Sequence, residues 1–151
     1  MLIGEYHYNL DEKKRLLLPA KIRKDLGKKG VLTKGLEGCL FLYPKKEWEK
    51  LVKKISDLPL GKKETRHFQR MLLAGAVEVS LDKQGRILIP DYLKKYADLG
   101  KKVVIVGVHT HLEIWAEEKW KEYQKKCETV SYTHLRAHET SLHLVCRLLL
   151  E

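Results

Sequence analysis

An aspartate followed four residues later by an arginine occurs twice in the chain, each time in a polar segment that leads into an apolar run and a proline. The segments are LDEKKRLLLP at 10–19 and LDKQGRILIP at 81–90. An aspartate carboxylate at the start of a turn can accept backbone N–H bonds and can hold an arginine guanidinium through two parallel hydrogen bonds. A guanidinium aimed in this way suits phosphate oxygens or the edge of a guanine base. The candidates for this chemistry are Asp11 with Arg15, and Asp82 with Arg86.

Lysines accompany both arginines. Lys13 and Lys14 precede Arg15, and Lys83 lies in the second segment. For a single copy, an ion pair across a surface hairpin, worth well under ~1 kcal/mol, is the favoured interpretation. Two copies at matched positions favour a function instead, because the residues around the turns are less alike than the turns themselves. We therefore predict that these cations contact nucleic acid.

The two segments differ at the residue before the arginine. Gly85 supplies the positive φ that such a turn needs, whereas Lys14 stands at the equivalent position of the first copy. A lysine in the left-handed conformation costs roughly 1–2 kcal/mol. The first turn is therefore expected to be either strained or of a different type. In exchange it has three consecutive cations, so we expect the first copy to contribute more of the electrostatics and the second more of the fixed geometry.

The net charge of +10, with 33% charged and 44% hydrophobic residues, indicates a soluble globular protein whose field concentrates polyanions near its surface. No apolar run approaches the roughly 20 residues of a membrane span, and the first residues lack the pattern of a signal peptide, so a cytoplasmic location is expected. The spacing of Cys39, Cys127 and Cys146 indicates neither a disulfide framework nor a zinc site. Cys39 is interpreted as a small core residue in a strand.

The repeated segments belong to a longer internal repeat with an offset of 71 or 72 positions, in which CLFLYPKKEWEKL at 39–51 matches HLEIWAEEKWKEY at 111–123. Each repeat predicts strand, turn, strand, a short helix, two further strands and an amphipathic helix. Pro19 and Pro90 are expected at the first helical position, and Gly27 at the end of the first short helix. The predicted strands are 5–9, 16–18, 31–35 and 39–43 in the first repeat, and 77–81, 87–89, 103–108 and 112–115 in the second.

Four short strands cannot bury both faces of their sheet alone. Two copies related by a pseudo-twofold axis would do so, which predicts a mixed, β-rich fold: a compact barrel or sandwich with peripheral helices. Residues 57–76 are predicted to contain a connecting helix with Phe68, Met71 and Leu72 facing inward.

The segments GEYHYNLDEKKRLLLPAKIR, LTKGLEGCLFLYPKKEWEKL, AVEVSLDKQGRILIPDYL and EIWAEEKWKEY together resemble the MraZ family of bacterial transcriptional regulators. The resemblance covers residues 1 to about 128. It implies two tandem AbrB-like repeats, at 1–56 and 77–128, with swapped hairpins in a β-barrel. It also implies a ring-shaped homo-oligomer, octamer or dodecamer, which binds short direct repeats in the promoter of the division and cell wall gene cluster. No cofactor and no enzymatic activity are implied, and the location becomes the cytoplasm in association with the nucleoid.

Carried onto this chain, the DNA-contacting motif arginines of the family are Arg15 and Arg86, and the motif aspartates are Asp11 and Asp82. The motif glycine is present as Gly85 and absent at Lys14.

Residues 129–151 differ in composition from the rest, since they contain no lysine and three of the seven histidines. They are interpreted as a non-native or disordered tail and are excluded from functional reasoning. A metal site formed by His134, His138 and His143 is the alternative, although no acidic partner shares the face of His134 and His138.

Two other classes of function compete with DNA binding. The first is a ring-shaped scaffold for protein partners, in which the arginine turns form subunit contacts. The second is an enzyme that uses His109 and His111, with Glu113 nearby, but no nucleophile or phosphate loop accompanies these residues. A single-repeat AbrB-type antitoxin is a relative within the DNA-binding class, and the duplication argues against it.

Overall fold

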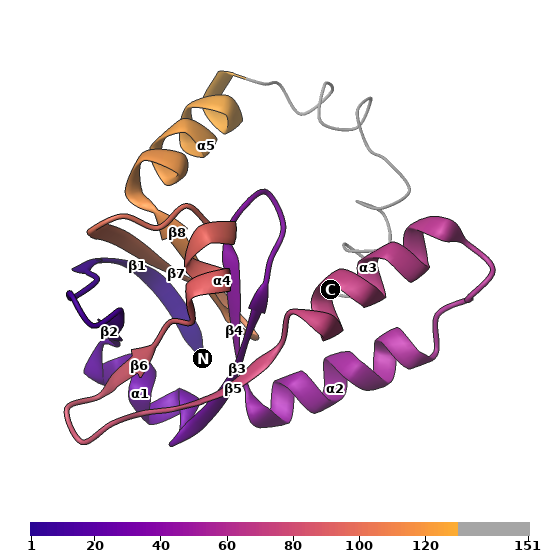
Figure 1. The fold of residues 1–151 in the computed structure, drawn as a ribbon, viewed down its shortest axis with the longest axis horizontal. Coiled ribbons are helices and arrows are strands. Elements are labelled where there is room, and N and C mark those ends of the chain that lie inside the picture. Colours follow the sequence, from indigo (N-terminus) through magenta and orange to yellow (C-terminus); the bar gives the residue numbers. More distant parts are fainter. Residues whose placement is uncertain (130–151) are drawn as a thin grey trace.

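The structure, a computed structural model, describes residues 1–129 of the 151-residue chain (Figure 1). Its elements follow the repeat that the sequence predicts. The first repeat contains β1 (Leu2–Asn9), β2 (Arg15–Leu17), α1 (Ala20–Leu26), β3 (Lys29–Lys34), β4 (Leu40–Pro44) and α2 (Lys45–Ser56). After α3 (Lys63–Ala74) come β5 (Val77–Ser80), β6 (Arg86–Leu88), α4 (Asp91–Tyr96), β7 (Lys102–His109), β8 (Leu112–Ala116) and α5 (Glu117–Thr129).

The strands form a six-stranded antiparallel sheet, in the order β1-β7-β8-β4-β3-β5, and a separate two-stranded ribbon of β2 and β6. If each strand is exchanged for its equivalent in the other repeat, the six-stranded order is reproduced in reverse, which is the signature of a pseudo-twofold axis. The β1–β2 hairpin of the first repeat pairs with β7 and β6 of the second, and β5 pairs with β3 of the first. The prediction of a duplicated, β-rich fold with swapped hairpins is confirmed.

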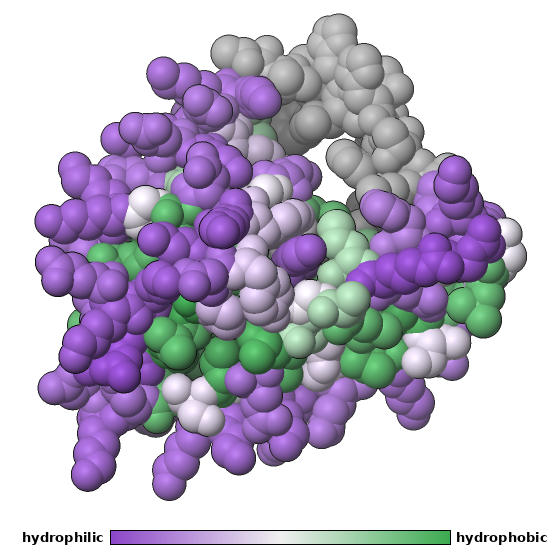
Figure 2. Space-filling model, viewed as in Figure 1, coloured by the Kyte–Doolittle hydropathy of each residue, from purple (hydrophilic) through white to green (hydrophobic). Residues whose placement is uncertain are grey.

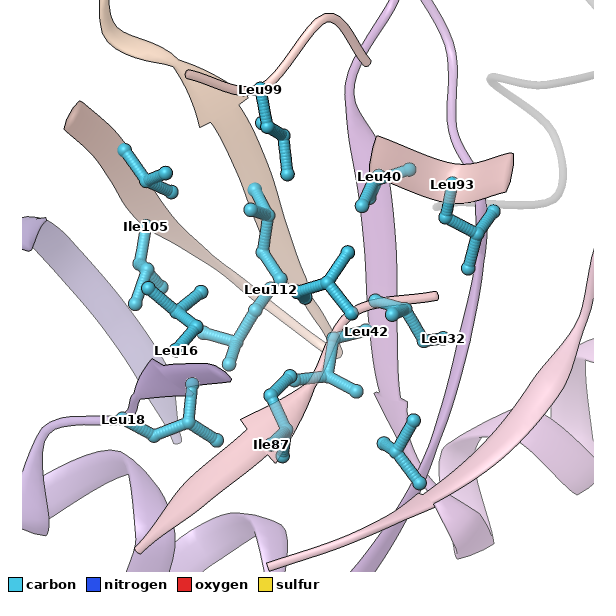
Figure 3. Close-up of a cluster of buried hydrophobic side chains, with 14 of the residues drawn as sticks. Leu16, Leu18, Leu32, Leu40, Leu42, Ile87, Leu93, Leu99, Ile105 and Leu112 are labelled. Atoms are coloured by element: carbon cyan, nitrogen blue, oxygen red, sulfur yellow. The ribbon is translucent and has the colours of Figure 1, made fainter. Parts of the chain in front are cut away.

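In the central strands β4, β7 and β8, successive residues alternate between two hydrophobic cores on opposite faces of the sheet. In β4, Leu40 and Leu42 belong to the first core, whereas Phe41 and Tyr43 belong to the second. The first core joins the sheet to the ribbon and to α1 and α4, and Figure 3 shows its leucine and isoleucine side chains gathered between these elements. The second core joins the sheet to α2, α3 and α5, and α2 and α3 lie side by side in Figure 1.

The ribbon owes its position to a short apolar underside. Leu16 of β2 and Ile87 of β6 are opposite each other and buried in the first core, and Leu18 and Ile89 follow them into it. Because side chains alternate along a strand, the neighbours of Leu16 and Ile87 must face away from this core. The core therefore fixes the orientation of the ribbon, with the face that contains the neighbours of Leu16 and Ile87 directed outward.

Several predicted boundaries shift in the structure. Pro19 and Pro90 have extended backbone, with ψ of 143° and 150°, so they precede their helices instead of forming the first helical position. The first strand begins at Leu2, not residue 5, because β7 is long enough to pair with it along its whole length. Cys39 is buried as expected, but it lies in the turn just before β4. Phe68 and Leu72 of α3 are buried and Met71 packs against the second core, as predicted.

Candidate nucleic-acid interface

Both motif arginines lie on the outward face of the ribbon. Arg15 pairs with Leu88, and Leu17 pairs with Arg86. Leu17 and Leu88 are 37% and 54% exposed, whereas the intervening residues are buried. Since paired residues share a face of a ribbon, the two arginines occupy diagonal positions on one exposed face, with Cα atoms about 7–8 Å apart. The structure thus brings together two candidates that are 71 positions apart in the sequence.

The two turns that precede the arginines have the same backbone hydrogen bonds. The carbonyl of Asp11 accepts the N–H of Lys14 at 3.0 Å, and the carbonyl of Asp82 accepts the N–H of Gly85 at 3.0 Å. Each aspartate N–H in turn donates to the carbonyl of its arginine, at 3.0 and 2.9 Å. A tight turn closed in this way and followed by one left-handed residue is a common three-residue hairpin loop. The turn geometry is therefore shared by both copies.

Lys14 is left-handed, with a φ of 63°, as is Gly85, with a φ of 79°. Of the two alternatives for the first turn, the structure has the strained one, since the turn type is unchanged. The Lys14 ammonium forms an ion pair with the carboxylate of Asp91, at the start of α4. This ion pair holds the pKa of Asp91 below its usual range, with the hydrogen bond from Lys14 as the largest cause. It also offsets one of the three consecutive cations of the first motif.

Replacing Lys14 with glycine should relieve this backbone strain. Lys14→Ala keeps a Cβ in the left-handed conformation and removes the ion pair, so the two variants differ mainly in the cost of the positive φ. We expect Lys14→Gly to be more stable than Lys14→Ala by about 1 kcal/mol, after the greater chain entropy of glycine is subtracted. Urea unfolding of the two variants measures the difference. Equal midpoints would show that residue 14 is not strained.

The aspartate carboxylates organise the turns through backbone amides. Oδ1 of Asp11 accepts the N–H of Arg15 at 2.8 Å. Oδ1 of Asp82 accepts the N–H groups of Gln84 and Arg86, each at 2.9 Å. The pKa of Asp82 is held below its usual range, chiefly by the backbone N–H of Arg86 and also by its guanidinium. Asp82 therefore remains ionised when it holds the turn together.

The Arg86 guanidinium is fixed by both motif aspartates. Its Nε donates to Oδ2 of Asp82 at 3.0 Å, and its Nη1 donates to Oδ2 of Asp11 at 3.5 Å. The predicted two-bond contact with Asp82 is wrong, because Oδ1 of that carboxylate is occupied by backbone amides. By contrast, no residue of 1–129 forms a hydrogen bond or an ion pair with the Arg15 guanidinium. Arg86 is the anchored arginine of the pair, and Arg15 is the one that is free to bind a ligand.

Each turn also contacts the short helix of the other repeat, which the sequence analysis missed. Lys14 meets Asp91 of α4, and the second turn meets Arg23 of α1, whose Nη1 donates to the carbonyl of Gln84 at 3.5 Å. A side chain at Gly85 would clash with the Arg23 guanidinium. Arg23 and Gln84 are 61 positions apart, and no repeat or periodicity in the sequence connects them. Only the swapped arrangement of the hairpins brings them together.

The histidines of the enzyme alternative do not share a site. His111 is 3% exposed and stacks on Tyr43, with ring centroids 4.5 Å apart, whereas His109 is exposed at the end of β7. Burial among aromatic rings lowers the pKa of His111 to about 4, which favours its neutral form. Within residues 1–129 no three metal-ligating side chains gather. The tail histidines of the metal alternative, and Cys146, lie outside the described residues.

The ribbon side of the molecule is hydrophilic and carries exposed lysines (Figure 2). In Figure 2, hydrophilic residues project along the lower left, where Figure 1 draws α1 and the β5–β6 turn. Lys13 and Lys83, at the tips of the two turns, are both exposed. In the part of the chain that the structure describes, no helix is long and apolar enough to cross a membrane.

Comparison with known proteins places the chain in one family. The family model described as "MraZ protein, putative antitoxin-like" matches twice, at residues 1–71 and 72–142. The two matches correspond to the internal repeat, and the second extends into the segment at 129–151 that the composition sets apart.

Related proteins are similar in sequence to this chain over most of their length. A protein of Caldanaerobacter subterraneus subsp. tengcongensis named transcriptional regulator MraZ is 49% identical over 138 residues, which cover 91% of this chain and 96% of the relative. The protein of the same name from a Thermoanaerobacter species is 47% identical over 144 residues, covering 95% of this chain and all of the relative. A Lactobacillus delbrueckii subsp. bulgaricus protein, also of that name, is 54% identical over 123 residues, or 82% and 86% of the two chains. With two tandem matches of the family model and relatives of this similarity, the chain belongs to the MraZ family.

Proposed function

We propose that this protein is a transcriptional regulator that binds double-stranded promoter DNA through the outer face of the β2–β6 ribbon. The observation that carries the proposal is the diagonal pair Arg15 and Arg86 on one exposed face, held from below by a buried apolar face. The relatives are named as transcriptional regulators, which supports the same role here.

The ribbon has the size and chemistry of a major-groove reader. The major groove of B-DNA admits a two-stranded β-ribbon, and an arginine there can donate two hydrogen bonds to a guanine. Arg15 is unpaired within the described residues and is assigned this base contact, together with Arg86 from its fixed position. The exposed lysines Lys13 and Lys83 at the turn tips are assigned to flanking phosphates, which position the protein without reading sequence.

One ribbon provides few contacts with DNA, so high affinity and specificity would require several ribbons that bind at the same time. We propose that the protein forms a ring-shaped homo-oligomer, octamer or dodecamer, and binds short direct repeats upstream of the division and cell wall gene cluster. Neighbouring subunits would then meet successive repeats at high effective concentration, and repeat spacing would add specificity. The proposed units are the repeats 1–56 and 77–128 and the connecting segment 57–76, and the proposed location is the cytoplasm in association with the nucleoid.

A gel-shift assay with the DNA upstream of its own gene tests this function. The full-length protein should bind this fragment and should lose affinity when the spacing between the direct repeats is changed by half a helical turn. Because phosphate contacts release counterions, affinity should also fall about a thousandfold or more between roughly 50 and 200 mM salt. Equal binding to the native and the respaced fragment would contradict sequence-specific recognition by an oligomer.

A further inference from the structure

A basic hollow of about 490 Å³ lies beside the second motif turn, between α1, the start of β3 and the end of β5. Four of the residues that line it are cations: Arg23, Lys28, Lys29 and Lys83. Lys28, Lys29 and Lys83 are exposed, so their ammonium groups can reach a ligand at the mouth of the hollow. The hollow is adjacent to Arg86 but does not include it.

The anionic groups near the hollow leave much of this positive charge uncompensated. Asp82 lines the hollow, but its carboxylate is occupied by the N–H groups of Gln84 and Arg86 and by the Arg86 guanidinium. Lys29 forms an ion pair with Glu78 at 3.7 Å, near the limit of such contacts, between two exposed side chains. An exposed pair at this distance holds its lysine weakly. The hollow therefore attracts an anion.

Arg23 gives the hollow a positioned hydrogen-bond donor. Its guanidinium lies over Gly85, where the absence of a side chain leaves room for it. Nη1 donates a long, weak hydrogen bond of 3.5 Å to the Gln84 carbonyl, and Nε is buried without a partner among the described residues. Because its guanidinium is already positioned at the wall of the hollow, Arg23 loses little conformational entropy when it binds phosphate oxygens there.

Among the described residues, the first motif turn has a different arrangement. There Lys14 occupies the position of Gly85, and its charge is paired with Asp91. The residue equivalent to Arg23 in the second repeat is Lys94, 71 positions later. The cationic hollow is thus a feature of the second turn that the pseudo-twofold symmetry does not require.

We infer that this hollow is a phosphate-binding subsite for the DNA backbone, in which Arg23 and Lys28 hold a phosphodiester beside the groove that the ribbon enters. The inference rests on the proposed function, since the phosphate belongs to the DNA that Arg15 reads. A ribbon in the major groove lies between two phosphate backbones, and the turn that precedes Arg86 lies at one end of the ribbon. Arg23 is then a positioning contact that sets the register of the protein on the duplex.

Fluorescence anisotropy with the labelled upstream duplex tests the subsite in the full-length protein. Arg23→Gln and Lys28→Gln are each expected to weaken binding about tenfold and to reduce the salt slope by about one for each engaged subunit. Lys24→Gln is the matched control, because Lys24 is exposed on the same helix and carries the same charge but does not line the hollow. It should change affinity by no more than about twofold, through the general field alone.

A duplex with a single uncharged methylphosphonate linkage, moved stepwise along each strand, locates the phosphate. At one linkage the modification should lower the affinity of the wild-type protein. The same modification should not lower the affinity of Arg23→Gln any further, because the modification and the substitution remove the same contact. A second experiment compares the thermal unfolding temperature of each protein in phosphate buffer and in chloride buffer of equal ionic strength. If free phosphate stabilises the wild type more than Arg23→Gln and no linkage is special, the hollow binds free anions, and the assignment to DNA is overturned.

The outcomes separate this inference from the proposed function. If the wild type fails to bind its upstream DNA, the proposed function itself fails. If it binds, but Arg23→Gln and Lys28→Gln both match the wild type or both match Lys24→Gln, the subsite is wrong and the function stands. Size-exclusion chromatography and thermal melting of each variant show whether weaker binding comes from a loss of structure, and Lys28→Gln, at an exposed position, tests the subsite even if Arg23→Gln is unstable.

Discussion

Arg15→Ala is expected to lower affinity for the upstream DNA by at least about 100-fold without changing the size of the proposed oligomer. The guanidinium has no partner within residues 1–129, so its removal leaves no other group of the described chain unpaired. A lost two-bond contact with a guanine costs about 1–3 kcal/mol, and the loss recurs in every subunit that engages a repeat. Anisotropy measures the affinity, and size-exclusion chromatography measures the oligomer.

Two further variants show what kind of contact Arg15 makes. Arg15→Lys keeps the charge but lacks the planar fork, so it should retain binding to unrelated DNA and lose preference for the native repeats. Arg86→Ala removes bonds to both motif aspartates, so unlike Arg15→Ala it should lower thermal stability together with affinity. If Arg15→Ala breaks the oligomer, the turns are subunit contacts and the scaffold alternative is favoured. Undiminished DNA binding would exclude Arg15 from the interface.

Leu16→Ala is expected to destabilise the protein by about 3–5 kcal/mol, because it removes a fully buried side chain beneath the ribbon. The cavity that remains lies inside the first core, whose other side chains are held by the six-stranded sheet and cannot collapse into it freely. The measurement is the free energy of unfolding in urea, from midpoints and slopes.

Leu17→Ala is the matched control, since it removes the same atoms from the next residue of the same strand. Leu17 faces outward, so its replacement should cost less than about 1 kcal/mol of stability. A similar loss for both variants would contradict the two-faced ribbon. If Leu17→Ala instead weakens DNA binding at unchanged stability, the outward face is the ligand-binding face, as proposed.

Local interactions explain why much of this fold could be predicted. The turn at Asp82 is closed by bonds between residues no more than four apart, so its residue types alone predict it. The alternation of apolar residues in the strands and the helical spacing of Phe68 and Leu72 follow from the periodicity of the backbone. These patterns can be read directly from the order of residues. The duplication is visible because both repeats retain the same order of turns, prolines and aromatic residues, and two similar units that each lack a complete core imply a symmetric pair.

The strand boundaries were less accurate for a physical reason. A strand extends as far as its neighbour offers backbone partners, and β1 begins three residues before the predicted strand because β7 pairs with it to His109. The strand propensities of residues 2–4 do not show how far the partner strand extends. The prolines likewise tolerate both the position before a helix and its first residue, and the extended ψ of the structure decides between them.

The sequence by itself determined that two Asp–Arg turns recur on related half-domains, and that one of them lacks its glycine. Only the tertiary structure decided what these residues contact. It placed Arg15 and Arg86 on one face, tied Arg86 to Asp11, paired Lys14 with Asp91 and laid Arg23 over Gly85. Each of these contacts joins the two repeats, and each exists because the hairpins are exchanged between them. Sequence patterns report which face of an element is buried, whereas the choice of its partner depends on the packing of the whole chain.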